Sequence, residues 1–341
     1  MQVYIAGGAV RDLLLGRRSR DKDYLVLGAS KNDFLLAFPQ ARLVGKAFPV
    51  FIDQGREFAF PRAQTLEQDL LARDLTINAM ALAPDGELIC HPEALHDIQT
   101  KILRPASANA MKNDPLRIIR AARLWSMLPD FSPHPTLIKA MQNAAKDNLL
   151  QNISADRIGL EVMKALRQIK PGNFLRLLHK GKCLSPWFQG LEKDIEDTAL
   201  LMDSFPGAPK TVWAALCHSV MPSREEGPST AWRLGINLKM PAKFVQTGDK
   251  AARLHKLAAA YSQLKAPEKV DLLMKTYSSS TFTPVFRIAE HLENKEIIST
   301  AQQDLTTILK VSLSDKEKNL GRQSGQILRT LRSKALQNDE L

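Results

Sequence analysis

The chain has 341 residues, of which 44% are hydrophobic and 24% charged, and it carries a formal net charge of +11 at pH 7. This length and apolar content predict two or three folded domains and exclude a globally disordered chain. No apolar stretch is long enough to span a bilayer, and the first residues lack the pattern of a secretory signal. Cys90, Cys183 and Cys217 are widely spaced, which favours reduced thiols over a disulfide framework or a zinc site. The composition therefore predicts a cytoplasmic protein.

The positive charge is unevenly distributed along the chain. Residues 1–104 contain 13 of the 47 Lys and Arg and 13 of the 36 Asp and Glu, which leaves 34 basic and 23 acidic residues for 105–341. The whole net charge of +11 therefore lies in the later part. A polyanion such as RNA would dock mainly there. The alternative is that the excess of basic residues only keeps the surface solvated.

The first motif predicts a phosphate-binding turn. The apolar run Val3–Ala6 is typical of a strand, and Ala9–Leu15 is typical of a helix. Between them, Gly7 and Gly8 allow an anion to approach the backbone at the amino end of the helix. Arg11 follows on the helix. Taken alone, such a Gly-Gly pair is more often a simple tight turn.

The second motif predicts a metal site. Asp21 and Asp23 flank Lys22 at the start of a second strand, Tyr24–Leu27. Residues i and i+2 of a strand point to the same face, so the two carboxylates can share Mg²⁺ ions. An isolated Asp-x-Asp pair is usually a turn or a solvated strand end, but here it follows a phosphate-binding turn. The combination favours nucleotidyl transfer.

The remainder of residues 1–104 predicts a mixed α/β arrangement. Helices are expected at 31–38 and at 65–73, where Thr65 and Gln68 have the form of a capping box. Three further strands are expected at 42–44, 49–52 and 57–60, with turns at Gly45 and at 53–55. A sheet of this order would bring Glu57 near the two aspartates. An exposed strand-end carboxylate is the alternative for Glu57.

From about residue 105 the chain is expected to be entirely helical. Residues 113–125 have the apolar spacing of an amphipathic helix, and Asp114, Arg117 and Arg120 lie on one face of it. Further helices are expected at 158–168, 173–179, 212–220, 242–266, 269–277 and 312–335. Asp114 has two interpretations, because it can also cap this helix next to Pro115.

Four segments occur in an order that resembles one enzyme family. They are Gly7–Asp12, Asp21–Asp23, Arg73–Ala79 and Asp114–Arg123. Together they resemble the bacterial class II tRNA nucleotidyltransferase (CCA-adding enzyme) and poly(A) polymerase family. A weaker fifth segment, Asp156–Glu161, is similar to the last neck motif of that family. The resemblance covers roughly residues 1–170.

The resemblance implies an α+β fold. A small mixed-sheet nucleotidyltransferase head at 1–104 would be followed by a helical neck at 105–170 and by a helical body and tail at 171–341. The base-recognition helix would belong to the neck. The body and tail would bind tRNA.

The resemblance also implies roles for individual residues. Asp21 and Asp23 would hold Mg²⁺, and Glu57 is the candidate for a third catalytic carboxylate. Asp114 and Arg117 would hydrogen-bond the edge of the incoming base. The remaining candidates for contacts with the nucleotide are Gly7, Gly8, Arg11, Lys46, Arg73, Asp74, Asn78 and Arg120.

The chain departs from the family pattern at several positions. Ala72 stands where an arginine is common, and Asn113 stands where a Glu is usual. The segment His91–Ile98 lacks the usual Asp-Pro pair and glycines; its two histidines are more often packing residues than metal ligands. Only Ala63 and Gln64 separate Arg62 from Thr65, where many relatives have a longer loop. In the family, loss of this loop accompanies enzymes that add C but not the terminal A.

These observations lead to a functional expectation with two alternatives. The chain is expected to extend the 3′ end of tRNA with CTP and ATP, without a nucleic-acid template, and to release pyrophosphate. Addition of CC alone is one form of this activity. A poly(A) polymerase would use the same residues, and a non-catalytic RNA-binding relative is the alternative from another class.

Overall fold

The computed structural model describes the chain except residues 19–21, 46–48, 62, 221–227 and 339–341. The described chain forms two compact units. The first comprises residues 1–153 together with 180–183, and the second comprises 154–179 together with 184–341. The division into head, neck, and body with tail stays a prediction.

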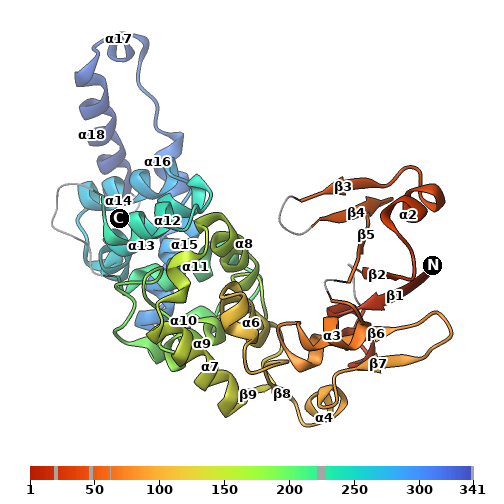
Figure 1. The fold of residues 1–341 in the computed structure, drawn as a ribbon. Helices are drawn as coiled ribbons and strands as arrows, with labels where there is room; N and C mark the ends of the chain where they lie inside the picture. The colour runs from red at the N-terminus through yellow and green to blue at the C-terminus, as the bar shows by residue number, and fades with distance from the viewer. Residues whose placement is uncertain (19–21, 46–48, 62, 221–227, 339–341) are drawn as a thin grey trace. The chain divides into compact units, whose positions relative to one another are not determined.

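A seven-stranded sheet forms the centre of the first unit (Figure 1). Its strands, in the order β3-β4-β5-β2-β1-β6-β7, are β3 (Arg42–Val44), β4 (Val50–Asp53), β5 (Arg56–Ala59), β2 (Asp23–Leu27), β1 (Gln2–Ala6), β6 (Met80–Leu82) and β7 (Leu88–Cys90). The pair β2–β5 is parallel, and the other neighbours are antiparallel. The expected mixed sheet is confirmed, and all five strands expected in the first 60 residues are present.

Helices cover both faces of this sheet because its strands are apolar on both sides. On one face, Phe51 and Phe58 pack on Phe34 of helix α2 (Lys31–Ala37), with ring centroids 5.1 and 5.2 Å apart. On the other face, Leu25 belongs to a core that includes Leu66 of α3 (Leu66–Leu71). Successive residues of a strand alternate between faces. Residues 23 and 25 therefore share the face covered by α3.

The other elements of the first unit are short except for two helices of 12 residues each, α6 (Leu116–Met127) and α7 (Pro135–Lys146). The short elements are α1 (Gly8–Leu14), the 3-10 helices η1 (Thr76–Asn78) and η2 (Leu149–Asn152), α4 (Ala94–Gln99), α5 (Ala110–Asn113), β8 (Ile102–Leu103) and β9 (Ser132–Pro133). Strands β8 and β9 pair in parallel. The expectation of an entirely helical chain after residue 105 is therefore wrong at β9, a two-residue strand with no periodicity of its own.

The helix expected at 113–125 is divided. Helix α5 ends at Asn113 and α6 begins at Leu116. Pro115 has no amide hydrogen, and a residue before proline avoids the helical region. Asp114 accordingly has extended backbone angles, φ −143° and ψ 96°. The break places Asp114 ahead of α6, at its amino end.

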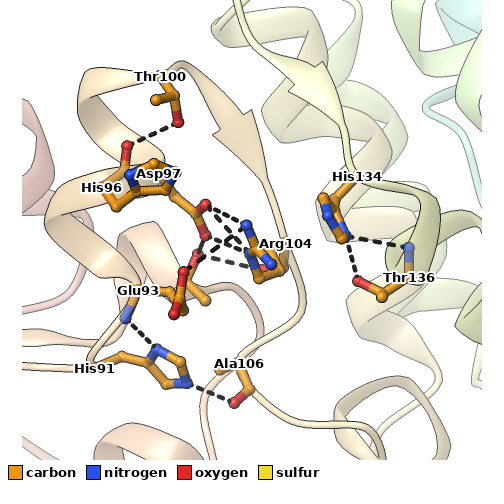
Figure 2. A network of polar contacts seen from close by, with 10 residues as sticks. His91, Glu93, His96, Asp97, Thr100, Arg104, Ala106, His134 and Thr136 are labelled. Atoms are coloured by element: carbon orange, nitrogen blue, oxygen red, sulfur yellow. Dashed lines mark hydrogen bonds and ion pairs between the residues drawn. The ribbon is translucent and has the colours of Figure 1, made fainter.

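A buried carboxylate of α4 links η1 to Arg104, the residue after β8, and Figure 2 shows Asp97 beside Arg104. Asp97 is fully buried and accepts a hydrogen bond of 2.7 Å from the Thr76 hydroxyl. Its oxygens also accept hydrogen bonds from Nε and Nη2 of Arg104, at 3.0 to 3.2 Å. The backbone carbonyl of Arg104 in turn accepts from the amide of Thr76. This pair therefore fixes the position of η1, the turn that carries Asn78.

The second unit is helical. Its elements are α8 (Ala155–Ala165), α9 (Gly172–Lys180), α10 (Ile195–Asp203), α11 (Pro209–His218), α12 (Thr230–Asn237), α13 (Ala242–Ala259), η3 (Tyr261–Gln263), α14 (Ala266–Ser278), α15 (Phe282–Glu293), α16 (Ile298–Lys310), α17 (Asp315–Lys318) and α18 (Arg322–Asn338). Its core includes Leu273, Val285 and Phe286. In the described part of the chain, none of the helices combines the length and the apolar character that a membrane span requires.

Two expected helices of this unit are each divided. The helix expected at 242–266 ends at Ala259, and α14 starts at Ala266 ahead of Pro267. The helix expected at 312–335 is separated into α17 and α18 by Gly321, whose φ of +56° is incompatible with a continuing helix.

Gly159 allows a close approach within the second unit. A Cβ atom built on this residue of α8 would overlap the backbone carbonyl oxygen of Leu238. By contrast, a Cβ built on Gly325 of α18 meets no atom within 4 Å. A side chain therefore has no room at Gly159 and free space at Gly325, although both glycines lie in helices.

We predict opposite effects for alanine at these two glycines. Gly325→Ala should raise the free energy of unfolding by up to about 1 kcal/mol, because alanine is the better helix former. Gly159→Ala should lower it by about 2 kcal/mol or more, because the backbone of Leu238 must move away. Urea unfolding followed by circular dichroism measures both values. Equal stability of the two variants would contradict the close approach.

We also predict unequal effects for the two carboxylates that face Arg104. Asp97→Ala should lower the free energy of unfolding of the first unit by about 3 kcal/mol, since it leaves Arg104 and Thr76 without their buried acceptor. Glu93→Ala is the matched control. Glu93 is half exposed and 3.9 Å from the same guanidinium, so its loss should cost less than about 1 kcal/mol. Hydrogen exchange of the amides between 74 and 106 locates the loss, and equal effects would refute the assignment.

Candidate active site

Two of the three expected carboxylates lie near the starts of two adjacent parallel strands. Asp23 begins β2, and the register places it directly beside Glu57 of β5. Directly opposed residues of neighbouring strands point to the same face, and such strands are about 4.8 Å apart. Both residues are exposed. The structure therefore brings Asp23 and Glu57 together, whereas Asp21 lies outside the described residues.

These carboxylates are neighbours of the glycine turn. On its other side, Asp23 pairs in register with Ala6, the last residue of β1. Gly7 follows with φ +72°, and its amide donates a hydrogen bond of 2.9 Å to the carbonyl oxygen of Met80. Only glycine adopts this backbone conformation without strain. The turn is thereby fixed next to the strand that begins with Asp23.

Two arginine side chains lie against the turn. A Cβ built on Gly7 would be 2.9 Å from Nη1 of Arg73, and one built on Gly8 would be 3.4 Å from Nη2 of Arg11. The absence of a Cβ on Gly7 therefore lets the Arg73 guanidinium approach the backbone, whereas a Cβ on Gly8 would make only ordinary contact with Arg11. Guanidinium groups and a bare backbone turn together suit an anionic phosphate.

Arg11 is held from two sides. Its Nη1 donates to Oδ1 of Asn78 at 2.6 Å, and its Nε and Nη2 donate to Oδ1 of Asp12 at 2.9 and 2.7 Å. The residue is 4% exposed. Burial lowers the pKa of its guanidinium, while the charge of Asp12 acts in the opposite direction. The side chain is therefore positioned before any ligand binds.

Asp74 connects this cluster to α6. Its carboxylate accepts hydrogen bonds from the Leu75 amide at 2.9 Å, from Nδ2 of Asn78 at 3.0 Å and from Nε of Arg120 at 3.1 Å. Burial alone would raise the pKa of Asp74, but Arg120 and the donated hydrogen bonds outweigh it and lower the pKa to about 2. Asp74 is therefore a carboxylate at neutral pH, and Asn78 links it to Arg11.

Arg73 is oriented by groups on both sides of it. Its Nη1 lies 3.4 Å from the carbonyl oxygen of Asn78, and its Nη2 lies 3.4 Å from Oδ2 of Asp69. Asp69 is buried and lies four residues earlier, on α3. Its carboxylate holds the guanidinium over the glycine turn.

The expected base-recognition residues occupy the start of α6. Oδ1 of Asp114 accepts a hydrogen bond of 3.2 Å from the Leu116 amide, which is the helix-start role left open above. Nη1 of Arg117 donates to the backbone carbonyls of Arg73 and Ala110, at 3.2 and 3.1 Å. All three segments of the cluster, the glycine turn, Arg73–Asn78 and α6, are therefore connected by polar contacts.

Some functional positions escaped the sequence analysis, and one expected position cannot be placed. Asp12 and Asp69, which hold Arg11 and Arg73, were not singled out. The i, i+4 spacing of Asp69 and Arg73 on an expected helix is the signal that could have identified that pair. Lys46 lies outside the described residues.

The structure also accounts for His91, the first histidine of the altered motif. The ring of His91 accepts from the Glu93 amide and lies 3.0 Å from the carbonyl oxygen of Ala106 (Figure 2). Both ring nitrogens therefore contact the backbone. Within the described ranges, no group of three or more His, Cys, Asp or Glu side chains is arranged to hold a metal ion.

Two family models match the chain. The poly A polymerase head domain matches residues 46–104, and the probable RNA- and SrmB-binding site of polymerase A matches residues 130–195. A CCA-adding enzyme of Coxiella burnetii is 29% identical over 297 residues, which cover 81% of this chain and 77% of that protein. A multifunctional CCA protein of Haemophilus influenzae is 37% identical over 215 residues, 56% of this chain and 51% of that one. The chain thus spans about half the length of the latter protein.

Solved structures agree in fold. The structure of a CCA-adding enzyme with ATP gives a TM-score of 0.74 at 21% identity and covers 98% of this chain and 86% of that one. The Thermotoga maritima CCA-adding enzyme complexed with tRNA gives a TM-score of 0.72 at 20% identity, with the same two coverages. These likenesses confirm the expected α+β fold. The two family models and the curated relatives show that the chain is similar to the tRNA nucleotidyltransferase and poly(A) polymerase family.

Proposed function

We propose that the chain is a template-independent nucleotidyltransferase of the CCA-adding type, which extends the 3′ end of tRNA with CTP and ATP and releases pyrophosphate. The observation that carries the proposal is the register of Asp23 and Glu57 beside a glycine turn covered by two arginines. The names of the curated relatives support the same reaction. The poly A polymerase head domain keeps addition of A tails to RNA as the alternative.

The carboxylates fit a divalent cation. Asp23 and Glu57 present hard oxygen ligands from adjacent strand ends, and Asp21 would add a third carboxylate from the preceding residues. We assign Mg²⁺ to them. When bound, it would supply the positive charge that favours the ionised 3′-hydroxyl of the RNA and the leaving pyrophosphate. The protein side chains would hold the cation next to the glycine turn.

The arginine cluster would bind and orient the nucleotide. Gly7 and Gly8 offer a bare backbone, while Arg11 and Arg73 lie against it with their carboxylate partners behind them. A guanidinium has five N–H donors, so a group that uses two or three of them for anchoring still has others for phosphate. These residues would align the α-phosphate for attack. Lys46 is a further candidate for the triphosphate from the sequence alone.

Base choice would depend on the start of α6. Asp114 can accept from the amino group of C or A, and Arg117 can donate to ring and carbonyl acceptors. Arg117 is positioned by two backbone carbonyls, and Arg120 by Asp74. Asp74 and Asn78 would also supply polar groups for the ribose. The side chains thus replace a nucleic-acid template.

A finer proposal concerns the number of nucleotides added. Strand β5 ends at Ala59 and α3 begins at Leu66, so only residues 60–65 connect them. We propose that this short connection favours addition of CC over complete CCA.

The deciding experiment offers labelled CTP or ATP with Mg²⁺ to tRNA transcripts that end before the tail, after C and after CC. Incorporation of C only supports CC addition, and a completed tail supports the full CCA activity. Long A tails on an unrelated RNA would instead establish a poly(A) polymerase. Incorporation into none of these RNAs would leave an RNA-binding relative.

We predict that the strand-end carboxylates are needed for incorporation and not for RNA binding. Asp23→Asn should reduce incorporation about a thousandfold, equivalent to about 4 kcal/mol of transition-state stabilisation. Glu57→Gln should also reduce it, with a smaller effect. Asp85→Asn, in the turn between β6 and β7, is the control and should change nothing. Asp21→Ala should likewise abolish incorporation, and activity retained by the Asp23 or Asp21 variant would refute the metal assignment.

We further predict that Arg73 acts on nucleotide binding. Arg73→Ala should raise the KM for CTP about 10-fold or more, because a charge-assisted contact contributes about 1.5 to 3 kcal/mol. The matched control is Arg42→Ala, which removes an exposed arginine from β3 at the edge of the sheet. Asp69→Asn should show part of the Arg73→Ala effect. An unchanged KM in Arg73→Ala would contradict its position over the glycine turn.

A further inference from the structure

A cavity of about 600 Å³ lies within the second unit, apart from every residue discussed above. Its lining comes from three helices: the start of α11, the end of α14 and the start of α15. The lining residues that bear on a ligand are Lys210, Thr211, Tyr277, Ser280, Thr283 and Arg287. None of the described residues that line it is acidic. A cavity of this size accommodates a small organic ligand.

Two helix starts and two basic side chains lie at the cavity. Helices α11 and α15, of 10 and 12 residues, both begin at it, and neither start has a side-chain cap or an acidic residue in its first turn. The amino end of a helix carries a partial positive charge and unsatisfied amides. Lys210, in the first turn of α11, adds a cation where the helix dipole disfavours one. Arg287 adds another from the second turn of α15.

These two cations are not neutralised within the described chain. Neither Lys210 nor Arg287 forms an ion pair with any residue that the structure describes, whereas Arg11, Arg73 and Arg120 each contact a carboxylate. Arg287 is exposed and Lys210 is half-buried, so water solvates both, and an anion bound between them would gain from two cations and two helix starts. The hydroxyl groups of Thr211, Ser280 and Thr283 offer further donors to such an anion.

An exposed aromatic ring also lines the cavity, and it indicates which group a ligand would carry besides an anion. Tyr277 lines the cavity near the end of α14 and is 48% exposed, unlike Tyr261 of the same unit, which is 1% exposed. An exposed ring beside cations is the combination on which a nucleobase stacks while its phosphate binds nearby. Phosphate and base together describe a nucleotide.

We propose that this cavity binds one nucleotide unit of the RNA substrate, with a backbone phosphate between Lys210 and Arg287 and the base against Tyr277. The proposal rests on the proposed function for the identity of the RNA. It commits to RNA because the net charge of +11 lies entirely outside residues 1–104, on the part of the chain that contains the cavity. A free nucleotide is the alternative occupant.

The test measures equilibrium binding of a tRNA transcript at several salt concentrations, without nucleoside triphosphate. Lys210→Ala combined with Arg287→Ala should weaken binding about 10-fold and reduce the slope of log K against log salt by about 1 to 2. Tyr277→Ala should weaken binding, and Tyr277→Phe should not. Lys295→Ala is the control, since it removes one cation beyond the other end of α15, about 12 Å along the chain axis from Arg287 of the cavity.

The outcomes separate this proposal from the proposed function. Binding that is unchanged in the double variant, or a loss per charge equal to that of Lys295→Ala, would overturn the cavity assignment and leave the catalytic proposal standing. The wild-type protein could also bind AMP, and the double variant could lose AMP binding while its tRNA binding is unchanged. That result would assign the cavity to a free nucleotide and overturn the RNA proposal. The binding assay does not depend on catalysis. If Asp23→Asn loses incorporation but binds tRNA normally, the cavity variants can still be compared by their tRNA binding.

Discussion

The arrangement of the site depends on the hydrogen bonds that the buried carboxylate of Asp74 accepts. It accepts hydrogen bonds from its own turn, from Asn78 of η1 and from Arg120 of α6, and Asn78 passes the connection to Arg11. In surroundings of low polarity each of these bonds is strengthened, and a lost partner leaves an expensive unsatisfied group. Three segments far apart in the sequence are thereby tied into one geometry. A nucleotide would meet donors that need little rearrangement, which is the arrangement that electrostatic catalysis requires.

The same network explains how several arginines can share a small volume. Arg11 contacts Asp12, Arg73 contacts Asp69 and Arg120 contacts Asp74, so each of these cations lies beside its own carboxylate. The pairs neutralise the cluster in the absence of ligand. Arg73 and Arg120 stay partly exposed, at 22% and 41%, whereas Arg11 is 4% exposed. The acidic partners therefore act as supports for binding residues. They also limit how strongly the site attracts anions in general, which favours a ligand that satisfies the remaining donors in one defined geometry.

The sequence predicted the elements that carry local signals and missed those set by distant partners. Apolar runs between glycine turns identified strands β1 to β5, and the order of these strands was enough to predict that Glu57 lies near Asp23. The apolar periodicity that predicted a helix from residue 113 continues across Pro115, whereas a helix start at that proline was the alternative interpretation of Asp114. Strand β9 has two residues and exists only because β8 pairs with it. The supporting roles of Asp12 and Asp69 depend on which way two arginines turn, and the apolar pattern does not determine side-chain direction.

The net positive charge and the arginine cluster next to the glycine turn lie in different parts of the chain. Residues 1–104 have no net charge, and the arginines of the cluster are paired there with carboxylates over short distances. Pairs that are buried or half-buried are little affected by salt, whereas exposed cations lose their effect on a distant polyanion beyond about 10 Å at 0.1 M. If the chain has the proposed function, ionic strength should weaken RNA binding through the uncompensated charge of the later part far more than it disturbs the geometry of the arginine cluster. Affinity for RNA and orientation of the nucleotide would then be supplied by different groups of residues, and each could change without loss of the other.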